Sequence, residues 1–256
     1  MMLCLDVGNS HIYGGVFEGE TIRLRFRHTS KDCTSDEFGI FLKQVLRENA
    51  CSPESIDAIA ICSVVPRLDY SLRAACLKYF SIEPFILQAG AKTGLDIRYH
   101  HPAEVGADRI ANAIAATRAF PQKNLIVIDF GTATTFCAIR AGKTYLGGAI
   151  MPGVRLSVDA LSANTAKLPR VEIVKPQQAV GRTTAESIQS GIFFGALGAC
   201  REMVASIRES VFSGEDVLVL ATGGFASFFD KHGIFDVHLP DLVLEGVRLA
   251  ALMNPV

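Results

Sequence analysis

Tryptophan is absent from the 256 residues, and neither sign of charge prevails, because 25 lysines and arginines stand against 26 aspartates and glutamates. A net charge of -1 without a long block of like charge excludes the basic footprint of a nucleic-acid binder and the polybasic face of a membrane-surface protein. The N-terminus has no basic segment and soon reaches Asp6, unlike a secretory signal. No apolar run approaches the roughly 20 residues that a membrane span needs. We therefore expect a cytoplasmic protein with no nucleic-acid or membrane partner.

Two further patterns are missing. The seven cysteines are odd in number and contain no Cys-x-x-Cys pair, which argues against a disulfide framework. The sequence also lacks Gly-x-x-x-x-Gly-Lys-Ser/Thr, so a phosphate loop of that type is excluded. What is abundant is apolar side chain, at 49% of the residues, in a chain long enough for one large domain or two ordinary ones.

The first half of the chain is typical of a β-meander followed by alternating helix and strand. Three short β-type runs come first, separated by turn residues, over 2–7, 11–17 and 21–28. Thr34 and Glu37 then form a capping-box pattern ahead of apolar residues at helical spacing, which predicts a helix. A strand, a helix and a strand follow, over 56–65, 67–80 and 84–88.

The second half repeats this order. Three strands are expected over 124–129, 134–140 and 143–150, with a helix from Pro152 onward. Thr183 and Glu186 form another capping box before a long apolar stripe. A strand over 217–221 and a closing helix over 242–253 complete the chain. The repeated order predicts a duplicated α/β fold with two domains, residues 1–120 and 121–256.

One motif occurs in both halves. Asp6-Val7-Gly8-Asn9-Ser10 and Asp129-Phe130-Gly131-Thr132-Ala133-Thr134-Thr135 each follow a short apolar run. Glycine lets the backbone approach a phosphate, while the N–H groups and hydroxyls can donate to its oxygens. The aspartates supply hard oxygen ligands suited to Mg²⁺ or a monovalent ion. A single copy could be an ordinary hairpin turn, but two copies in matching contexts favour two similar domains around one nucleotide.

A third motif, Gly106-Ala107-Asp108-Arg109, occurs once and precedes a helical pattern. The positive end of a helix favours a charged carboxylate, so we expect Asp108 to stay ionised and to be a weak base, adequate for phosphoryl transfer. Arg109 could hold a substrate carboxylate or neutralise the transferring phosphate. The alternative is an ordinary helix-start acid beside a solvated arginine. Thr222-Gly223-Gly224 follows a strand and would suit a backbone packed against a nucleotide.

These motifs, together with residues 147–153 (GGAIMPG) and 184–191 (TAESIQSG), resemble type III pantothenate kinases in order and over essentially the whole chain. The resemblance implies an actin-like ATPase fold of two ribonuclease-H-like domains, each with a mixed sheet flanked by helices, in a homodimer. It also implies transfer of the ATP γ-phosphoryl group to the 4′-hydroxyl of pantothenate, the first step of coenzyme A biosynthesis. Family members need Mg²⁺ and a monovalent cation, K⁺ or NH₄⁺.

The same resemblance implies site residues. The ATP contacts would be Asp6, Val7, Gly8, Asn9, Ser10, His11, Ile12, Tyr13 and Thr132. The pantothenate contacts would be Tyr99, Gly106, Ala107, Asp108, Arg109 and Thr184. Asp108 would be the catalytic proton acceptor, Asp129 the potassium ligand, and Asp6 the magnesium ligand.

Two other functions compete with the kinase. One is a non-catalytic, nucleotide-binding regulatory accessory protein of the same fold, and the presence of both Asp6 and Asp108 argues against it. The other is a superfamily enzyme that acts on a sugar or on polyphosphate. Gly106–Arg109 beside the later Thr184–Ser187 favours pantothenate over that alternative.

Overall fold

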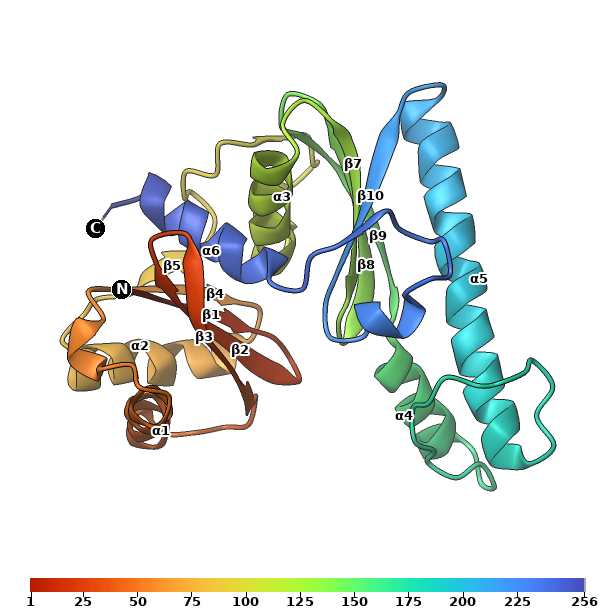
Figure 1. The fold of residues 1–256 in the computed structure, drawn as a ribbon, viewed down its shortest axis with the longest axis horizontal. Helices are drawn as coiled ribbons and strands as arrows, with labels where there is room; N and C mark the ends of the chain where they lie inside the picture. Colours follow the sequence, from red (N-terminus) through yellow and green to blue (C-terminus); the bar gives the residue numbers. More distant parts are fainter. Residues whose placement is uncertain (256) are drawn as a thin grey trace. The chain divides into compact units, whose positions relative to one another are not determined.

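The computed structural model describes residues 1–255, which form two compact units, each built on one mixed β-sheet (Figure 1). Unit 1 comprises Met1–Leu95, His100–Ala115 and the segment from Leu242 onward, and unit 2 comprises Asp96–Tyr99 and Ala116–Asp241. The chain thus passes into unit 2 close to the break expected near residue 120, but its last helix belongs to unit 1. The domain limits 1–120 and 121–256 stay a prediction, since they follow chain order and these units do not.

The sheet of unit 1 has the strand order β3-β2-β1-β4-β5. Its strands are β1 (Met2–Val7), β2 (His11–Glu18), β3 (Thr21–Thr29), β4 (Ala58–Ser63) and β5 (Phe85–Leu87). The first three form an antiparallel meander, while β4 runs parallel to β1 and β5 runs parallel to β4. Central β1 is an almost unbroken apolar run, as expected of a strand that is covered on both faces.

Helices cover this sheet. Unit 1 contains α1 (Ser35–Glu48), η1 (Pro53–Ser55), α2 (Pro66–Phe80), η2 (Pro102–Glu104), the start of α3 (Ala107–Ala119), and α6 (Leu242–Met253). Thr34 caps α1 with the full predicted capping box, since its side chain accepts the Glu37 N–H and the Glu37 carboxylate accepts the Thr34 N–H. Phe38 and Leu42 of α1 join Leu68 and Leu72 of α2 in the core against the sheet. Helix α6 packs on β1.

Unit 2 repeats the topology, with the strand order β11-β10-β7-β8-β9-β6. Its strands are β6 (Asp96–Ile97), β7 (Asn124–Phe130), β8 (Ala133–Arg140), β9 (Thr144–Pro152), β10 (Val217–Thr222) and β11 (Val237–His238). Strands β7–β9 form an antiparallel meander and β10 runs parallel to β7, as β4 does to β1. Strand β6 is an addition at the edge beside β9. The predicted duplicated α/β fold is confirmed.

The helices of unit 2 pack around a phenylalanine cluster. They are α4 (Val154–Asn164), α5 (Thr184–Phe212) and η3 (Ala226–Phe229). Phe193 of α5 stacks on Phe229 of η3, and Phe229 stacks on Phe130 of β7, with ring centroids 5.6 and 5.0 Å apart. The predicted capping box at Thr183 is half formed. Thr183 accepts the Glu186 N–H, but the Glu186 carboxylate accepts the N–H of Arg182 instead.

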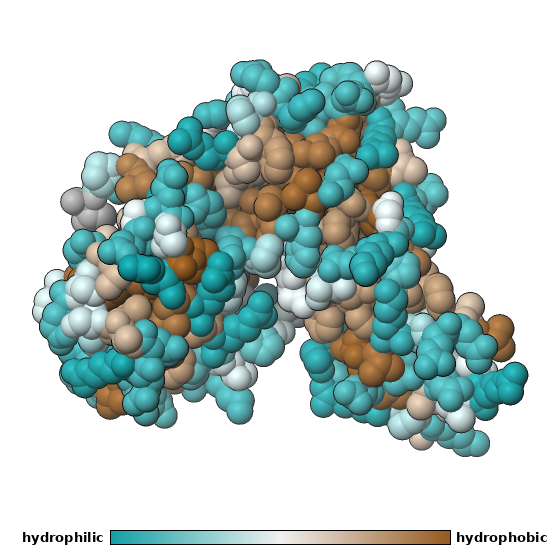
Figure 2. Space-filling view, in the orientation of Figure 1, coloured by the Kyte–Doolittle hydropathy of each residue, from teal (hydrophilic) through white to brown (hydrophobic). Residues whose placement is uncertain are grey.

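Helix α5 bears on the expectation that the protein has no membrane partner. Within residues 1–255 it is the one helix that is long and apolar enough to cross a membrane, by length and composition alone, and 28% of its most apolar stretch is buried. The sequence argument looked for an unbroken apolar run, whereas α5 reaches a mean hydropathy of 1.2 over an 18-residue stretch in which polar residues interrupt the apolar ones. Phe193, Leu197 and Cys200 on one side of the helix belong to the core of unit 2. Figure 2 shows hydrophilic and apolar side chains intermixed over the visible surface. The length and composition of α5 are therefore only weak support for a membrane span.

Candidate active site

The first Asp-x-Gly turn lies in unit 1 between β1 and β2, at the carboxyl end of the central strand. Asp6 is half-buried and pairs across the sheet with Tyr13 on β2 and with Cys62 on β4. The Gly8 N–H donates to the carbonyl of His11 at 3.1 Å and closes the turn. The neighbouring strands therefore hold the Asp6 carboxylate beside a tight turn of backbone.

Not every residue of the expected ATP-binding set can offer its side chain. Val7 and Ile12 are 0% exposed and belong to the apolar core of unit 1. Asn9 and His11 are exposed at the tip of the turn, and Ser10 is half-buried. Any contact from Val7 or Ile12 is therefore a contact of the main chain, which agrees with a turn that presents backbone groups to a phosphate.

Asp108 stands in the first turn of α3, as predicted, but its environment differs from the expectation. Burial raises the pKa of the Asp108 carboxyl, against the opposing influence of the Arg109 N–H, which donates to its Oδ1 at 2.8 Å. Desolvation thus outweighs the favourable helix N-terminus that the sequence argument considered, while the role of Asp108 as a weak base for phosphoryl transfer stays a prediction. Asp108 is a stronger base than an ordinary aspartate.

Gly106 is packed tightly against this carboxylate. A Cβ at position 106 would lie 2.4 Å from Oδ1 of Asp108, closer than real Cβ atoms approach any atom. The absence of a side chain at Gly106 therefore creates the space that the carboxylate occupies.

Cys62, near the carboxyl end of β4, lies within electrostatic range of both Asp6 and Asp108. Burial, together with the charges of Asp6 and Asp108, raises the pKa of the fully buried Cys62 thiol. Both carboxylates therefore lie close enough to this end of β4 to act on it electrostatically. The structure thus brings together, within one unit, the predicted magnesium ligand and the predicted proton acceptor.

The remaining residues of the expected pantothenate set are distributed between the units. Arg109 follows Asp108 on α3 and is 6% exposed, so it is not the solvated arginine of the alternative interpretation. Tyr99 follows β6 in unit 2, where its ring lies beside Gly147 of β9. Thr184 is exposed at the start of α5.

The second Asp-x-Gly turn lies in unit 2 between β7 and β8. The Gly153 N–H donates to the carbonyl of Thr132 at 3.1 Å, which ties the turn to the end of β9. Gly223 has φ +91°, and a Cβ there would lie 2.4 Å from Oδ1 of Asp129. Gly223 was expected to suit a nucleotide, whereas here it packs against the Asp129 carboxylate. The sequence indicates a glycine at the end of a strand, but it does not indicate that Gly223 packs against Asp129.

No cage for a metal is preformed: among residues 1–255, no three His, Cys, Asp or Glu side chains converge on a common point. Mg²⁺ usually keeps several waters and binds through one or two carboxylates and substrate phosphates. The Asp6 carboxylate beside the Gly8 turn fits that mode of binding, because it can supply one oxygen ligand next to backbone groups of the turn. Asp129 beside Gly223 offers one hard oxygen donor of the kind a monovalent ion accepts.

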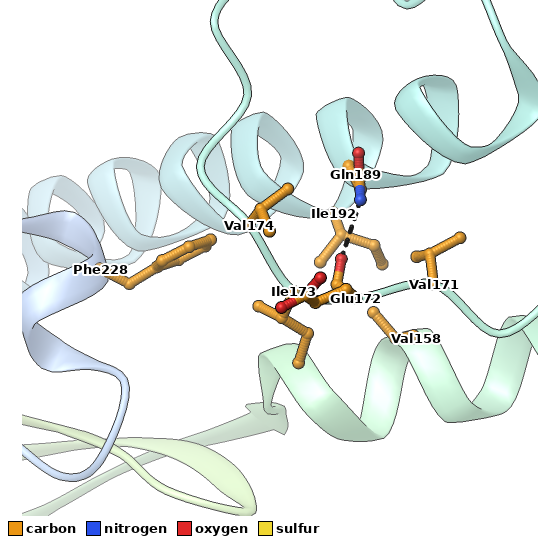
Figure 3. Close-up of a pocket in the computed structure, with 8 residues that line it drawn as sticks. All are labelled: Val158, Val171, Glu172, Ile173, Val174, Gln189, Ile192 and Phe228. Atoms are coloured by element: carbon orange, nitrogen blue, oxygen red, sulfur yellow. Dashed lines mark hydrogen bonds between the residues drawn. The ribbon is translucent and has the colours of Figure 1, made fainter.

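Unit 2 also contains a small pocket under the segment that precedes α5 (Figure 3). Apolar side chains line it, and Nε2 of Gln189 donates to the Glu172 carbonyl at 3.0 Å across it. Its volume of about 10 Å³ has room for about one water molecule. It is therefore a packing defect beside an anchored segment and too small for a nucleotide or for pantothenate.

Two units of matching topology, each presenting an aspartate at a glycine turn after its central strand, are the arrangement of the actin-like ATPase fold. A ROK hexokinase from Thermus thermophilus has this fold, with a TM-score of 0.53 and 13% identity over 99% of this chain and 98% of that one.

The family is narrower than the fold. The sequence model of the type III pantothenate kinase family matches residues 2–206. A type III pantothenate kinase of Legionella pneumophila (strain Paris) is 70% identical over 99% of both chains. Type III pantothenate kinase 1 of Francisella tularensis subsp. holarctica (strain OSU18) is 48% identical over 99% of this chain and all of its own. The chain belongs to the type III pantothenate kinase family.

Proposed function

We propose that this chain transfers the γ-phosphoryl group of ATP to the 4′-hydroxyl of pantothenate and so makes 4′-phosphopantothenate, the first step of coenzyme A biosynthesis. The single observation that carries the mechanism is the half-buried Asp108 at the start of α3, whose pKa is raised by desolvation and which lies in the same unit as the Asp6 turn. Membership of the family supplies the identity of the acceptor.

Asp108 is the proton acceptor in this proposal. Its Oδ2 takes the proton of the 4′-hydroxyl as that oxygen bonds to the γ-phosphorus, and the bond from the γ-phosphorus to the β,γ-bridging oxygen breaks to release ADP. Oδ1 meanwhile stays on the Arg109 N–H. A loose phosphoryl-transfer transition state needs little deprotonation at its start, so a carboxylate suffices, and a raised pKa strengthens it as a base. The other proposed pantothenate contacts are Tyr99, Gly106, Ala107, Arg109 and Thr184.

ATP is bound, in this proposal, by residues 6–13 and by Thr132. The backbone N–H groups of the first turn and the Ser10 hydroxyl donate to phosphate oxygens, and Asp6 holds Mg²⁺ through an oxygen. Mg²⁺ supplies neutralisation of the charge that spreads over the transferring phosphoryl group. Asp129 is the proposed ligand of K⁺ or NH₄⁺.

We also propose a cytoplasmic homodimer. Support comes from one side of α5, where Gly191, Gly195 and Gly198 have no atom within 4 Å of an added Cβ and Phe194 is 37% exposed. A close-packing apolar face of this kind suits a second copy of the chain. Gly195→Glu should give a monomer in light scattering after gel filtration; a dimer in this variant would exclude the α5 face.

The direct test is an assay with Mg–ATP and pantothenate in which phosphopantothenate is detected by mass spectrometry, in K⁺, NH₄⁺ or Na⁺. Product is expected in K⁺ and NH₄⁺ and little in Na⁺. No product in any of the three salts would overturn the kinase proposal and favour the non-catalytic accessory alternative. Product in glucose or polyphosphate controls would favour the other enzyme class. Equal rates in all three salts would remove only the role of Asp129.

A further inference from the structure

We infer that Ser30 is a positioning residue which orients the Gly8–Asn9 peptide of the first turn for binding an ATP phosphate. This inference rests on the proposed function of residues 6–13. Ser30 directly follows β3, is 7% exposed, and carries no signal in the sequence motifs. It reaches the turn from the meander side of the sheet.

A single residue ties both ends of the turn. The Ser30 N–H donates to the carbonyl of Ser10 at 3.1 Å, and the Ser30 hydroxyl donates to the carbonyl of Gly8 at 2.5 Å. From the other side, the Val64 N–H donates to the carbonyl of Val7 at 3.0 Å. The carbonyls of residues 7, 8 and 10 are therefore all bound by neighbouring segments of unit 1.

Because the peptide group is planar, the hydrogen bond from Ser30 to the Gly8 carbonyl also fixes the direction of the Asn9 N–H. In a trans peptide the C=O of one residue and the N–H of the following residue point in opposite directions. Since Oγ of Ser30 holds the Gly8 carbonyl, the Asn9 N–H points to the opposite side of the turn. Among residues 1–255 this N–H donates to no protein group, and Asn9 is exposed. A phosphate oxygen is an acceptor that such a donor fits.

Ser30 is itself held by its main chain. Nη2 of Arg67, on α2, donates to the Ser30 carbonyl at 3.1 Å, and the same guanidinium pairs with Asp32. Both backbone groups of Ser30 are thus bonded without its hydroxyl. Removing the hydroxyl should leave the chain path in place and release only the Gly8 carbonyl.

The test compares Ser30→Ala with Ser30→Thr and with the matched control Ser55→Ala. Ser55 also donates its hydroxyl to a backbone carbonyl, that of Ser52, at the opposite end of β1. We expect Ser30→Ala to raise the Kd for Mg–AMP-PNP, measured by calorimetry, about tenfold, the scale of one hydrogen bond. The KM for pantothenate should stay near that of the wild type, and the melting temperature should fall no further than in Ser55→Ala, which also loses one hydrogen bond from a hydroxyl to a carbonyl. Ser30→Thr and Ser55→Ala should bind AMP-PNP normally.

Three outcomes would overturn the inference: an AMP-PNP Kd within twofold of the wild type in Ser30→Ala, failure of Ser30→Thr to restore affinity, or equal losses for both substrates with a lowered melting temperature. These outcomes are separable from failure of the proposed function. If the wild type makes no phosphopantothenate yet Ser30→Ala still weakens AMP-PNP binding, the kinase proposal fails and Ser30 keeps its role.

Discussion

Replacing Gly106 by alanine tests whether the position of the Asp108 carboxylate limits turnover. The new Cβ would lie 2.4 Å from Oδ1 of Asp108, whereas ordinary van der Waals contacts of a Cβ begin at 3.4 Å. The obstructed atom is the end of a side chain, so the carboxylate can rotate away while the backbone keeps its path. A shift of about 1 Å in a reacting group can cost roughly 10²-fold in rate, and we expect kcat to fall by that factor.

Two further measurements separate displacement from general damage. Because Asp108 must be unprotonated to accept a proton, the acid limb of the pH–rate profile follows its pKa. A carboxylate pushed toward water loses the desolvation that raises this pKa, so the limb should move to lower pH in Gly106→Ala. The melting temperature should change little.

The decisive control is the double variant Gly106→Ala with Asp108→Asn. If Gly106 acts through Asp108, the double variant should be no slower than Asp108→Asn alone, because the same interaction cannot be lost twice. Additive losses in kcat would refute the reasoning, because they would show that Gly106 affects turnover independently of the Asp108 carboxylate.

Three further substitutions test other parts of the molecule. Asp108→Asn should lower kcat at least about 10²-fold. It should also raise the melting temperature at neutral pH, because a carboxyl whose pKa is raised in the folded protein destabilises that protein as the pH rises from the ordinary value of 3.8 through the raised pKa. The gain should vanish below pH 3.8, where the carboxyl is protonated in the folded and unfolded protein. A gain that persists there would contradict this cause. Gly223→Ala should lower the melting temperature, because its Cβ would lie 2.6 Å from the Phe130 backbone nitrogen. In the folded fraction it should also raise the K⁺ concentration for half-maximal rate more than the KM for ATP, because the same Cβ would displace Asp129; an unchanged K⁺ titration would exclude this. Thr34→Ala should cost about 1 kcal/mol in urea unfolding with unchanged kcat, and no loss would deny the cap its role.

Local signals predicted most of the secondary structure. The Thr34 capping box marks the start of α1, and the closing helix was expected over 242–253, the bounds of α6. Such features depend on residues within one turn or strand, so the chain carries them whatever it packs against. The recurrence of the meander, then strand and helix, predicted the duplicated sheets for the same reason.

Long-range packing explains what the sequence could not predict. Whether a helix-start acid is solvated or buried depends on what covers it, so the raised pKa of Asp108 was missed. The approach of Gly223 to Asp129 depends on the parallel register that pairs Thr222 with Asp129 across β10 and β7. The roles assigned to individual site residues stay predictions until the substitutions above are measured.

The return of α6 to the first unit has a consequence for synthesis of the protein. All of unit 2 except Asp96–Tyr99 is one continuous stretch, Ala116–Asp241. Helix α6, which packs on β1, is synthesised only after that stretch. Chains emerge from the ribosome N-terminus first at about 5–20 residues per second, so the sheet translated first is the one completed last. For more than 100 residues of elongation, the apolar face of β1 that α6 later covers is available to chaperones.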